Sequence, residues 1–182
     1  HHGYSYVDRV FIPLRLFLIS CPSDTGHIVL CSKMGNQLHN LYPRISKICV
    51  LRNAAFLVDP LKVILPVSLK RIGYLSNLST DKGIDTVLDL AAELLCSAPE
   101  ISVELAGPAQ DSLTEKLVRQ RMQNLPNVKW HGPLYGESKN KFLSEIDVLV
   151  FPTRYRNEAE PLVILEALAA GRSSGTPATA PS

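Results

Sequence analysis

The sequence predicts an α/β fold in which a parallel sheet is covered by helices on both faces. From residue 70 onward, short apolar runs alternate four times with segments whose apolar residues recur at helical spacing. The connections are short, and the run DVLVFPT (147–153) is apolar almost throughout, as expected of a strand buried on both sides. Alternation of this kind favours right-handed βαβ units and therefore a Rossmann-like layered sheet.

The elements of this sheet follow one another up to residue 171. Four strands are predicted from short apolar or β-type runs: 70–76, 101–107, 127–132 and 147–153. Four helices are predicted from apolar residues at helical spacing: 84–95, 111–125, 137–146 and 161–170. Pro161 suits the first position of the last helix, because the N–H that proline lacks is not needed there.

A shorter piece of the same pattern precedes the sheet. A strand is predicted at 27–32, a helix at 33–43 and a second strand at 46–51. The stretch that follows, 52–68, contains prolines and has no clear period, so a domain boundary is expected there. We therefore expect one piece over residues 1–60 and a second domain over 61–171.

The last residues, 172–182, change to small polar residues and prolines and form a low-complexity tail. Because this tail contains no apolar run, no further strand is expected there. The sheet is expected to be cut off after Gly171.

Composition bounds the classes of partner. Of the 182 residues, 46% are hydrophobic, which suffices for a sizeable core. The net charge of +2 includes no long basic run, so nucleic acid is not expected as a partner. The four cysteines are widely spaced and form no C-x-x-C pair, which argues against a metal or disulfide framework and for a reducing, cytoplasmic location.

The most apolar stretch near the beginning is VFIPLRLFLIS (10–20). It is too short to span a bilayer and contains Pro13 and Arg15. We expect a core helix; a helix on a membrane surface is the alternative and leaves a peripheral membrane association open. No methionine begins the chain, so His1 is expected to lie within a longer gene product or to belong to a tag.

A single glutamate, Glu166, interrupts the apolar helix 161–170. A helix that is apolar on all sides is normally buried, and a buried carboxylate must be paired or hydrogen-bonded. An ion pair, or a helix edge that touches solvent, is one explanation. A bound ligand is the other, because a helix that begins after the carboxyl end of a parallel strand is a common site for anions.

Further charges favour a ligand at this helix. Glu158 and Glu160 precede it, where they stabilise the positive end of the helix dipole. Glu166 lies about 7–8 Å further along the axis, at ~1.5 Å per residue, a gap that one nucleotide would span. Carboxylates accept hydrogen bonds from hydroxyls, so a nucleotide sugar, anionic in the middle and rich in hydroxyls at both ends, suits the pattern. Lys82 beside Gly83 offers the positive charge, although a solvated lysine beside a turn glycine is the alternative.

Four segments together resemble one known family in their order and spacing: YLSNLSTDKGID (74–85), ISVELAGPA (101–109), residues 127–153 and EAEPLVILE (158–166). The last resembles the E-x7-E motif of the group-1 nucleotide-sugar glycosyltransferases, and the first resembles their Gly-Arg-x-x-x-x-Lys-Gly loop. The first third of the chain resembles the end of the N-terminal domain of that family, with HHGYSY (1–6) loosely similar to an acceptor-side His segment.

The resemblance implies a fold and a chemistry. The fold would be an incomplete GT-B arrangement: the end of the acceptor domain with its linker (1–60), then the donor-binding Rossmann domain (61–171). The activity would be a retaining transfer of a sugar from a nucleotide-diphosphate sugar to a carbohydrate or lipid-linked acceptor. The family uses no D-x-D metal site, and none occurs in this sequence. No cofactor is implied, since the nucleotide sugar is a substrate.

The resemblance also implies roles for individual residues. Glu158 would be the catalytic carboxylate beside the transferred sugar, and Glu166 would bind the ribose hydroxyls. Lys82 would neutralise the diphosphate leaving group. The other donor-binding residues would be Asn77, Gly83, Gly107, Gly132, Pro133, Leu134, Pro161, Leu162 and Val163. Among these, Gly107 would let the backbone approach the ligand, 132–134 would touch the base, and the backbone at 161–163 would hold the diphosphate or the sugar.

Three departures accompany the resemblance. Ser76-Asn77 stands where the family usually has Gly-Arg, so one phosphate-binding cation is missing. Pro161-Leu162 stands where the family usually has Phe-Gly, so one backbone N–H donor is missing. The sequence also lacks most of the acceptor domain, so the chain alone is not expected to complete catalysis. A catalytically silent, truncated α/β module that binds a nucleotide or nothing remains the alternative. A sugar-nucleotide epimerase is a further alternative, against which the E-x7-E spacing argues.

Overall fold

A computed structural model describes residues 12–56, 68–155, 161–171 and 173–175. They form two compact units, one over residues 12–56 with Pro161 and one over residues 68–155, 162–171 and 173–175. The predicted catalytic residue Glu158, the segment HHGYSY and the expected domain boundary after residue 60 lie outside the described residues.

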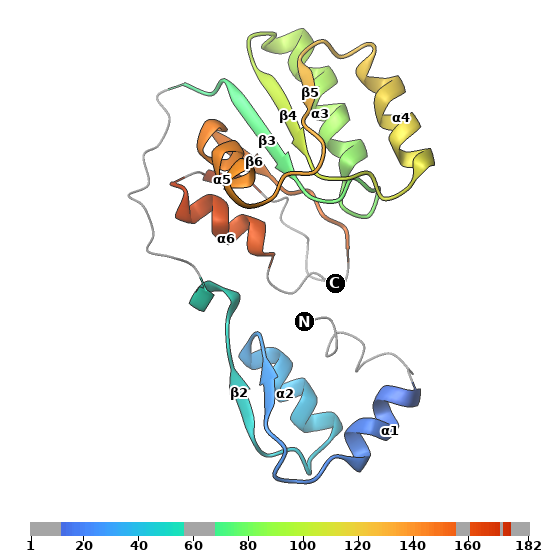
Figure 1. Cartoon of the computed structure of the whole chain (residues 1–182), viewed down its shortest axis with the longest axis vertical. Coiled ribbons are helices and arrows are strands. Elements are labelled where there is room, and N and C mark those ends of the chain that lie inside the picture. The colour runs from blue at the N-terminus through green and yellow to red at the C-terminus, as the bar shows by residue number, and fades with distance from the viewer. Residues whose placement is uncertain (1–11, 57–67, 156–160, 172, 176–182) are drawn as a thin grey trace. The chain divides into compact units, whose positions relative to one another are not determined.

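The first unit is a small α/β piece (Figure 1). Its elements are α1 (Ile12–Ser20), β1 (His27–Val29), α2 (Ser32–Leu41), β2 (Ile48–Val50) and the 3-10 helix η2 (Asn53–Phe56). The strands β1 and β2 pair in parallel, with His27 opposite Ile48, and α2 connects them as the sequence predicts. Of the side chains described in α1, only Leu18 is buried, and it joins the small core of this unit. The predicted core helix, α1, therefore contacts the core along one narrow side, through Leu18.

The second unit contains one five-stranded parallel sheet (Figure 1). Its elements are β3 (Arg71–Leu75), α3 (Ile84–Ser97), β4 (Ser102–Ala106), α4 (Ser112–Met122), β5 (Val128–Trp130), α5 (Gly136–Glu145), β6 (Val148–Val150), α6 (Leu162–Ala169) and β7 (Ser173–Gly175). The strand order is β5-β4-β3-β6-β7, and every pair is parallel. The predicted α/β, Rossmann-like fold is confirmed, with all four strands and four helices from residue 70 onward present.

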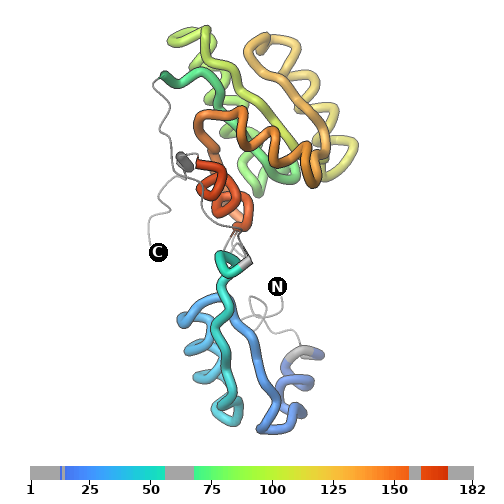
Figure 2. Tube along the Cα trace, turned by 60° about the vertical axis from the view of Figure 1, so that its left-hand side comes forward, coloured from blue at the N-terminus to red at the C-terminus, as the bar shows by residue number. Residues whose placement is uncertain are grey.

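Each face of this sheet has its own core, covered by two helices (Figure 2). On one face Ile72 and Tyr74 of β3 pack with α3 and α4, and on the other Leu75 packs with α5 and α6. Alternate residues of a strand point to opposite faces, so β3 contributes to both cores. Burial on both faces is the reason that the strands read as apolar runs.

The expectation that no strand follows Gly171 was wrong. Strand β7 pairs in parallel with β6, with Ser173 opposite Val148 and Gly175 opposite Val150. Strand pairing uses backbone N–H and C=O groups, so small polar residues can add a short strand at the edge of a sheet. The pairing also places β6 between two neighbours, in keeping with its apolar sequence.

Candidate functional site

The loops that leave the carboxyl ends of β3, β4, β5 and β6 are joined by main-chain hydrogen bonds. Three of these bonds, each 2.8 Å from nitrogen to oxygen, run from Leu78 to Pro108, from Gly107 to Gly132 and from Arg154 to Asp81. The four loops (76–83, 107–111, 131–135 and 151–155) are here named the carboxyl rim. Because open α/β sheets bind ligands beyond the carboxyl ends of their strands, the carboxyl rim is the candidate site.

A buried tyrosine supports two predicted residues in the first loop of the rim. The Tyr74 hydroxyl lies 3.2 Å from the carbonyl oxygen of Lys82 and 3.3 Å from that of Asn77. Burial raises the pKa of Tyr74, against a smaller lowering by a hydrogen bond with Ser76, so the hydroxyl stays protonated and donates. The residue Asn77 itself is exposed at the rim.

The Lys82 ammonium lies against a ring from another rim loop. Its Nζ is 4.5 Å from the centroid of the Tyr155 ring, a cation–π contact that links the loops after β3 and β6. Next to it, the Arg154 guanidinium pairs with the carboxylate of Asp85 in the first turn of α3 at 2.5 Å. Burial raises the pKa of Asp85, but the hydrogen bond and charge of Arg154, with backbone N–H groups, outweigh burial and leave the pKa lowered. Neither Tyr155 nor Arg154 was predicted; their place in the loop after β6 was the available signal.

Two predicted glycines pack against backbone. Gly83, which precedes α3 with φ 80°, has no room for a Cβ because of the Pro152 carbonyl, and Gly107, with φ 124°, has none because of the Ser76 carbonyl. The close approach at Gly107 is thus to the neighbouring loop. An approach of a ligand to Gly107 stays a prediction.

The predicted base-contacting residues, Gly132, Pro133 and Leu134, connect β5 to α5. Leu134 packs against the core under α5 and α6, whereas Pro133 is exposed. Just before them, His131 Nε2 lies 2.6 Å from Glu104 Oε2 of β4, with side chains that are 26% and 15% exposed. This pair, which the sequence analysis missed, fixes the start of the loop.

Glu166 forms an ion pair with Lys139 of α5. The Lys139 Nζ lies 2.6 Å from Glu166 Oε1, and the two side chains are 29% and 28% exposed. The expectation of a helix buried on all sides was wrong, because Leu162 and Leu168 of α6 are 45% and 42% exposed. Helix α6, whose residues other than Glu166 are small or apolar, covers one face of the sheet together with α5 and leaves its outer side in solvent. Pro161 and Val163 are partly buried.

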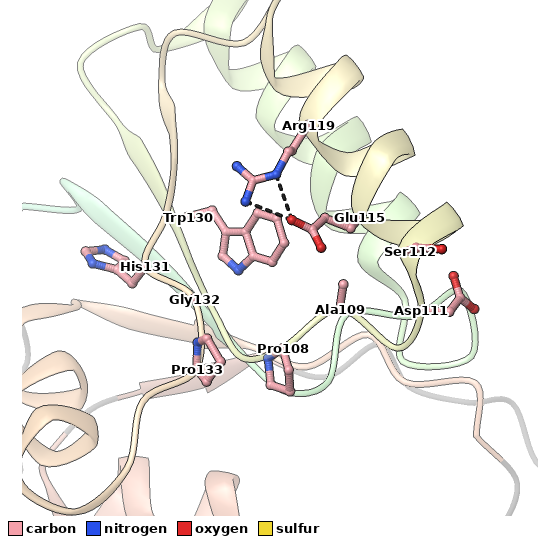
Figure 3. A pocket seen from close by; sticks show the side chains of 10 residues that line it. All are labelled: Pro108, Ala109, Asp111, Ser112, Glu115, Arg119, Trp130, His131, Gly132 and Pro133. Atoms are coloured by element: carbon pink, nitrogen blue, oxygen red, sulfur yellow. Dashed lines mark hydrogen bonds and ion pairs between the residues drawn. The ribbon is translucent and has the colours of Figure 1, made fainter.

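A pocket of about 600 Å³ opens beside the rim, where β4 and β5 end and α4 begins (Figure 3). Trp130 stands at its centre and donates from Nε1 to the Gly107 carbonyl at 3.0 Å. The Arg119 guanidinium lies 4.8 Å from the Trp130 ring centroid and pairs with Glu115 at 2.9 Å. Of the predicted site residues, Gly132 and Pro133 line this pocket.

The described parts of the chain offer neither a metal centre nor a helix able to span a membrane. No group of three His, Cys, Asp or Glu residues there could hold a metal ion. No helix among these residues has the length and apolarity needed to cross a membrane.

Comparison with known proteins adds a family and several structural likenesses. The sequence profile of the family described as "Glycosyl transferases group 1" matches residues 62–172, more than half of the chain. Among curated proteins, none matches the sequence.

Three solved structures illustrate the likeness in fold. HepE from Anabaena with UDP-glucose has a TM-score of 0.66 at 17% identity, covering 95% of this chain and 48% of that one. A mutant of TarM from S. aureus with UDP has a TM-score of 0.64 at 18% identity, covering 89% and 31%. The pneumococcal O-GlcNAc transferase GtfA with UDP and GlcNAc has a TM-score of 0.61 at 18% identity, covering 82% and 29%. The chain spans less than half of the length of each of these proteins.

Proposed function

The chain belongs to the group 1 glycosyl transferases, and from that premise we propose that it supplies the donor-binding part of a retaining, metal-independent glycosyltransferase. The donor is a nucleotide-diphosphate sugar, and the acceptor is a carbohydrate or a lipid-linked carbohydrate, which allows a peripheral association with a membrane. The assignment of a nucleotide-sugar donor draws support from the UDP and UDP-glucose in the related solved structures.

The observation that carries the proposal is the gathering of predicted donor-binding residues at one edge of the sheet. Loops after three strands, β3, β4 and β5, bring Asn77, Lys82, Gly107 and Gly132 to the carboxyl rim, where main-chain bonds hold the loops together. In the proposed site, Lys82 and the Asn77 amide bind the diphosphate, and residues 132–134 contact the base. Glu166 accepts hydrogen bonds from the ribose hydroxyls, and Pro161–Val163 follow the diphosphate or sugar.

The proposed reaction breaks the bond between the anomeric carbon and the diphosphate oxygen. An acceptor hydroxyl forms the new bond on the same face of the sugar and passes its proton to the departing diphosphate oxygen, and the nucleoside diphosphate leaves with both electrons of the broken bond. Lys82 offsets the charge that develops on the leaving oxygen, as such electrostatic stabilisation requires. Glu158 is proposed to lie beside the transferred sugar.

Isothermal titration with uridine and guanosine diphosphates tests the donor site. We expect saturable binding of at least one of them, weakened about tenfold by Glu166→Ala, the effect of losing one charge-assisted hydrogen bond. Glu145→Ala is the matched control, because Glu145 pairs with Lys141 on the exposed side of α5. That variant should bind like the wild type.

A catalytically silent module is the competing proposal. The observation that favours it is the Lys139–Glu166 ion pair, which gives the Glu166 carboxylate a partner without any ligand. Absence of binding to every nucleoside diphosphate would support this alternative and contradict the donor site.

A further inference from the structure

Helices α5 and α6 meet through an apolar contact with one ion pair at its border. Phe142 and Leu143 of α5 belong to the same core cluster as Ala167 of α6, with Val163 and Ile164 packed against it. Beside this contact, the ion pair joins Lys139 Nζ to Glu166 Oε1 at 2.6 Å. Both side chains are less than one third exposed, so water screens this pair less than it screens a pair at the surface.

The ion pair engages one oxygen of the carboxylate. An ionised carboxylate has two oxygens, each able to accept more than one hydrogen bond. Within the described residues, Lys139 is the side chain that donates to Glu166, and it donates to Oε1. The second oxygen, Oε2, therefore keeps its capacity to accept hydrogen bonds from hydroxyl groups.

The loop that leads into α5 and helix α6 carry residues assigned to adjoining parts of one nucleoside. Helix α5 begins at Gly136, one residue beyond the proposed base-contacting residues 132–134, and α6 carries the proposed ribose-binding residue Glu166. A base and its ribose are joined covalently, so the two contacts must be held at a fixed separation. Lys139 of α5, bound to the Glu166 carboxylate of α6, is placed to keep these two contacts at that separation.

The ammonium also compensates charge. A carboxylate near a diphosphate repels it, and the repulsion weakens when a cation lies in contact with that carboxylate. With Lys139 in place, Glu166 and its partner form a pair without net charge that can still accept hydrogen bonds.

We propose that Lys139 is a positioning residue for ribose recognition: its ammonium orients the Glu166 carboxylate so that Oε2 accepts hydrogen bonds from the ribose hydroxyls. The inference rests on the proposed donor site. It gives Lys139, which is not among the predicted donor-binding residues, a role in ribose recognition. In this role the Lys139–Glu166 ion pair does more than join α5 to α6.

The test compares nucleotides that differ in one ribose hydroxyl. Uridine and guanosine diphosphates and their 2′-deoxy counterparts are titrated into the full chain by calorimetry. The wild type should bind the ribonucleotide about tenfold more tightly than its 2′-deoxy form. Lys139→Met should reduce this ratio to about two or less, and Lys139→Arg, which keeps a cation, should retain most of it. The ratio compares two ligands on one protein, so a loss of folded protein does not change it.

Lys141→Met is the matched control, because Lys141 lies on the same helix with a 77% exposed side chain and pairs with Glu145 at 3.9 Å. It should keep the wild-type ratio. If Lys139→Met lowers the melting temperature but keeps the ratio, the pair is structural and the inference is overturned. If the wild type binds both nucleotides equally, the ribose assignment fails while the donor site stands. If the wild type binds none of them, the proposed function fails, and this inference with it.

Discussion

Gly107 and Gly132 both have positive φ angles, but their surroundings differ. A Cβ on Gly107 would collide with the backbone carbonyl of Ser76, whereas a Cβ on Gly132 would meet no atom within 4 Å. Both residues are glycines with a positive φ angle, but only Gly107 is packed against a neighbouring backbone segment.

Alanine substitution should separate these two effects. Gly132→Ala should lower the free energy of unfolding by about 1–2 kcal/mol, the cost of the left-handed backbone for a residue with a Cβ. Gly107→Ala should cost more, about 3 kcal/mol or above, because the loops after β3 and β4 must also move apart. Urea unfolding of both variants measures the difference. Equal decreases in the free energy of unfolding for the two variants would mean that the loops after β3 and β4 can move apart at little energetic cost.

Residue identities at the rim were predictable, but side-chain partners were not. Asn77, Lys82 and Gly107 follow strands that the apolar runs locate, so their shared edge could be inferred from the order of the elements. The partner of Glu166 could not, because Lys139 precedes it by 27 residues and meets it only through the packing of α5 on α6. The cation–π contact of Lys82 likewise depends on where the loop after β6 turns.

At the scale of elements, an ion pair connects the start of α3 with the loop after β6. Asp85 has a lowered pKa, so the folded state binds its proton less readily than the unfolded chain does. The ionised form therefore stabilises the fold fully above the ordinary pKa of 3.8, and this stabilisation is lost as the pH falls below that value.

Asp85→Asn removes the titrating group. The variant should be less stable than the wild type near neutral pH, and the difference should shrink as the pH falls below about 4. Thermal unfolding followed across this range checks the prediction. Asp24→Asn, which replaces an exposed carboxylate in the first unit, should follow the wild type at every pH. A difference between Asp85→Asn and wild type that does not change with pH would contradict the assignment.

A comparison of the strands shows which of them an apolar run is sufficient to predict. Strands β3, β4 and β6 lie inside the sheet, so their apolar runs predict them. Strand β7 pairs with β6 at the edge of the sheet, and its sequence, Ser173–Gly175, has no apolar run to reveal it.

At the scale of the whole molecule, the described chain has two units with cores of different size. The cluster of buried residues in the first unit has four members, and the larger cluster of the second has thirteen. Smaller cores bury less apolar surface and give lower stability, so the first unit is expected to open more often.

Amide hydrogen exchange should report this difference. The amides of β1 and α2 should exchange faster than those of β3 and β4. A nucleoside diphosphate at about 100 times its dissociation constant should slow global exchange in the second unit about a hundredfold, equivalent to ~2.7 kcal/mol. Equal slowing in the first unit would place ligand contacts there as well.

The order of elements and the parallel sheet of the second unit followed from the alternation of periods, because each apolar face needs a partner in the next layer. The proline-containing stretch after residue 51 predicts a domain boundary, and the predicted position of that boundary lies outside the described residues. The side-chain contacts of the proposed donor site depend on packing between distant segments, which periodicity does not encode.

The carboxyl rim is tied together by backbone atoms, and this has an evolutionary consequence. Main-chain N–H and C=O groups belong to every residue type except proline, which lacks the N–H, so most mutations leave these ties intact. Lineages that inherit such a scaffold can exchange outward-facing residues such as Asn77 and Pro133 at little cost to folding. Ligand preference can then drift between descendants while the architecture beneath it is conserved.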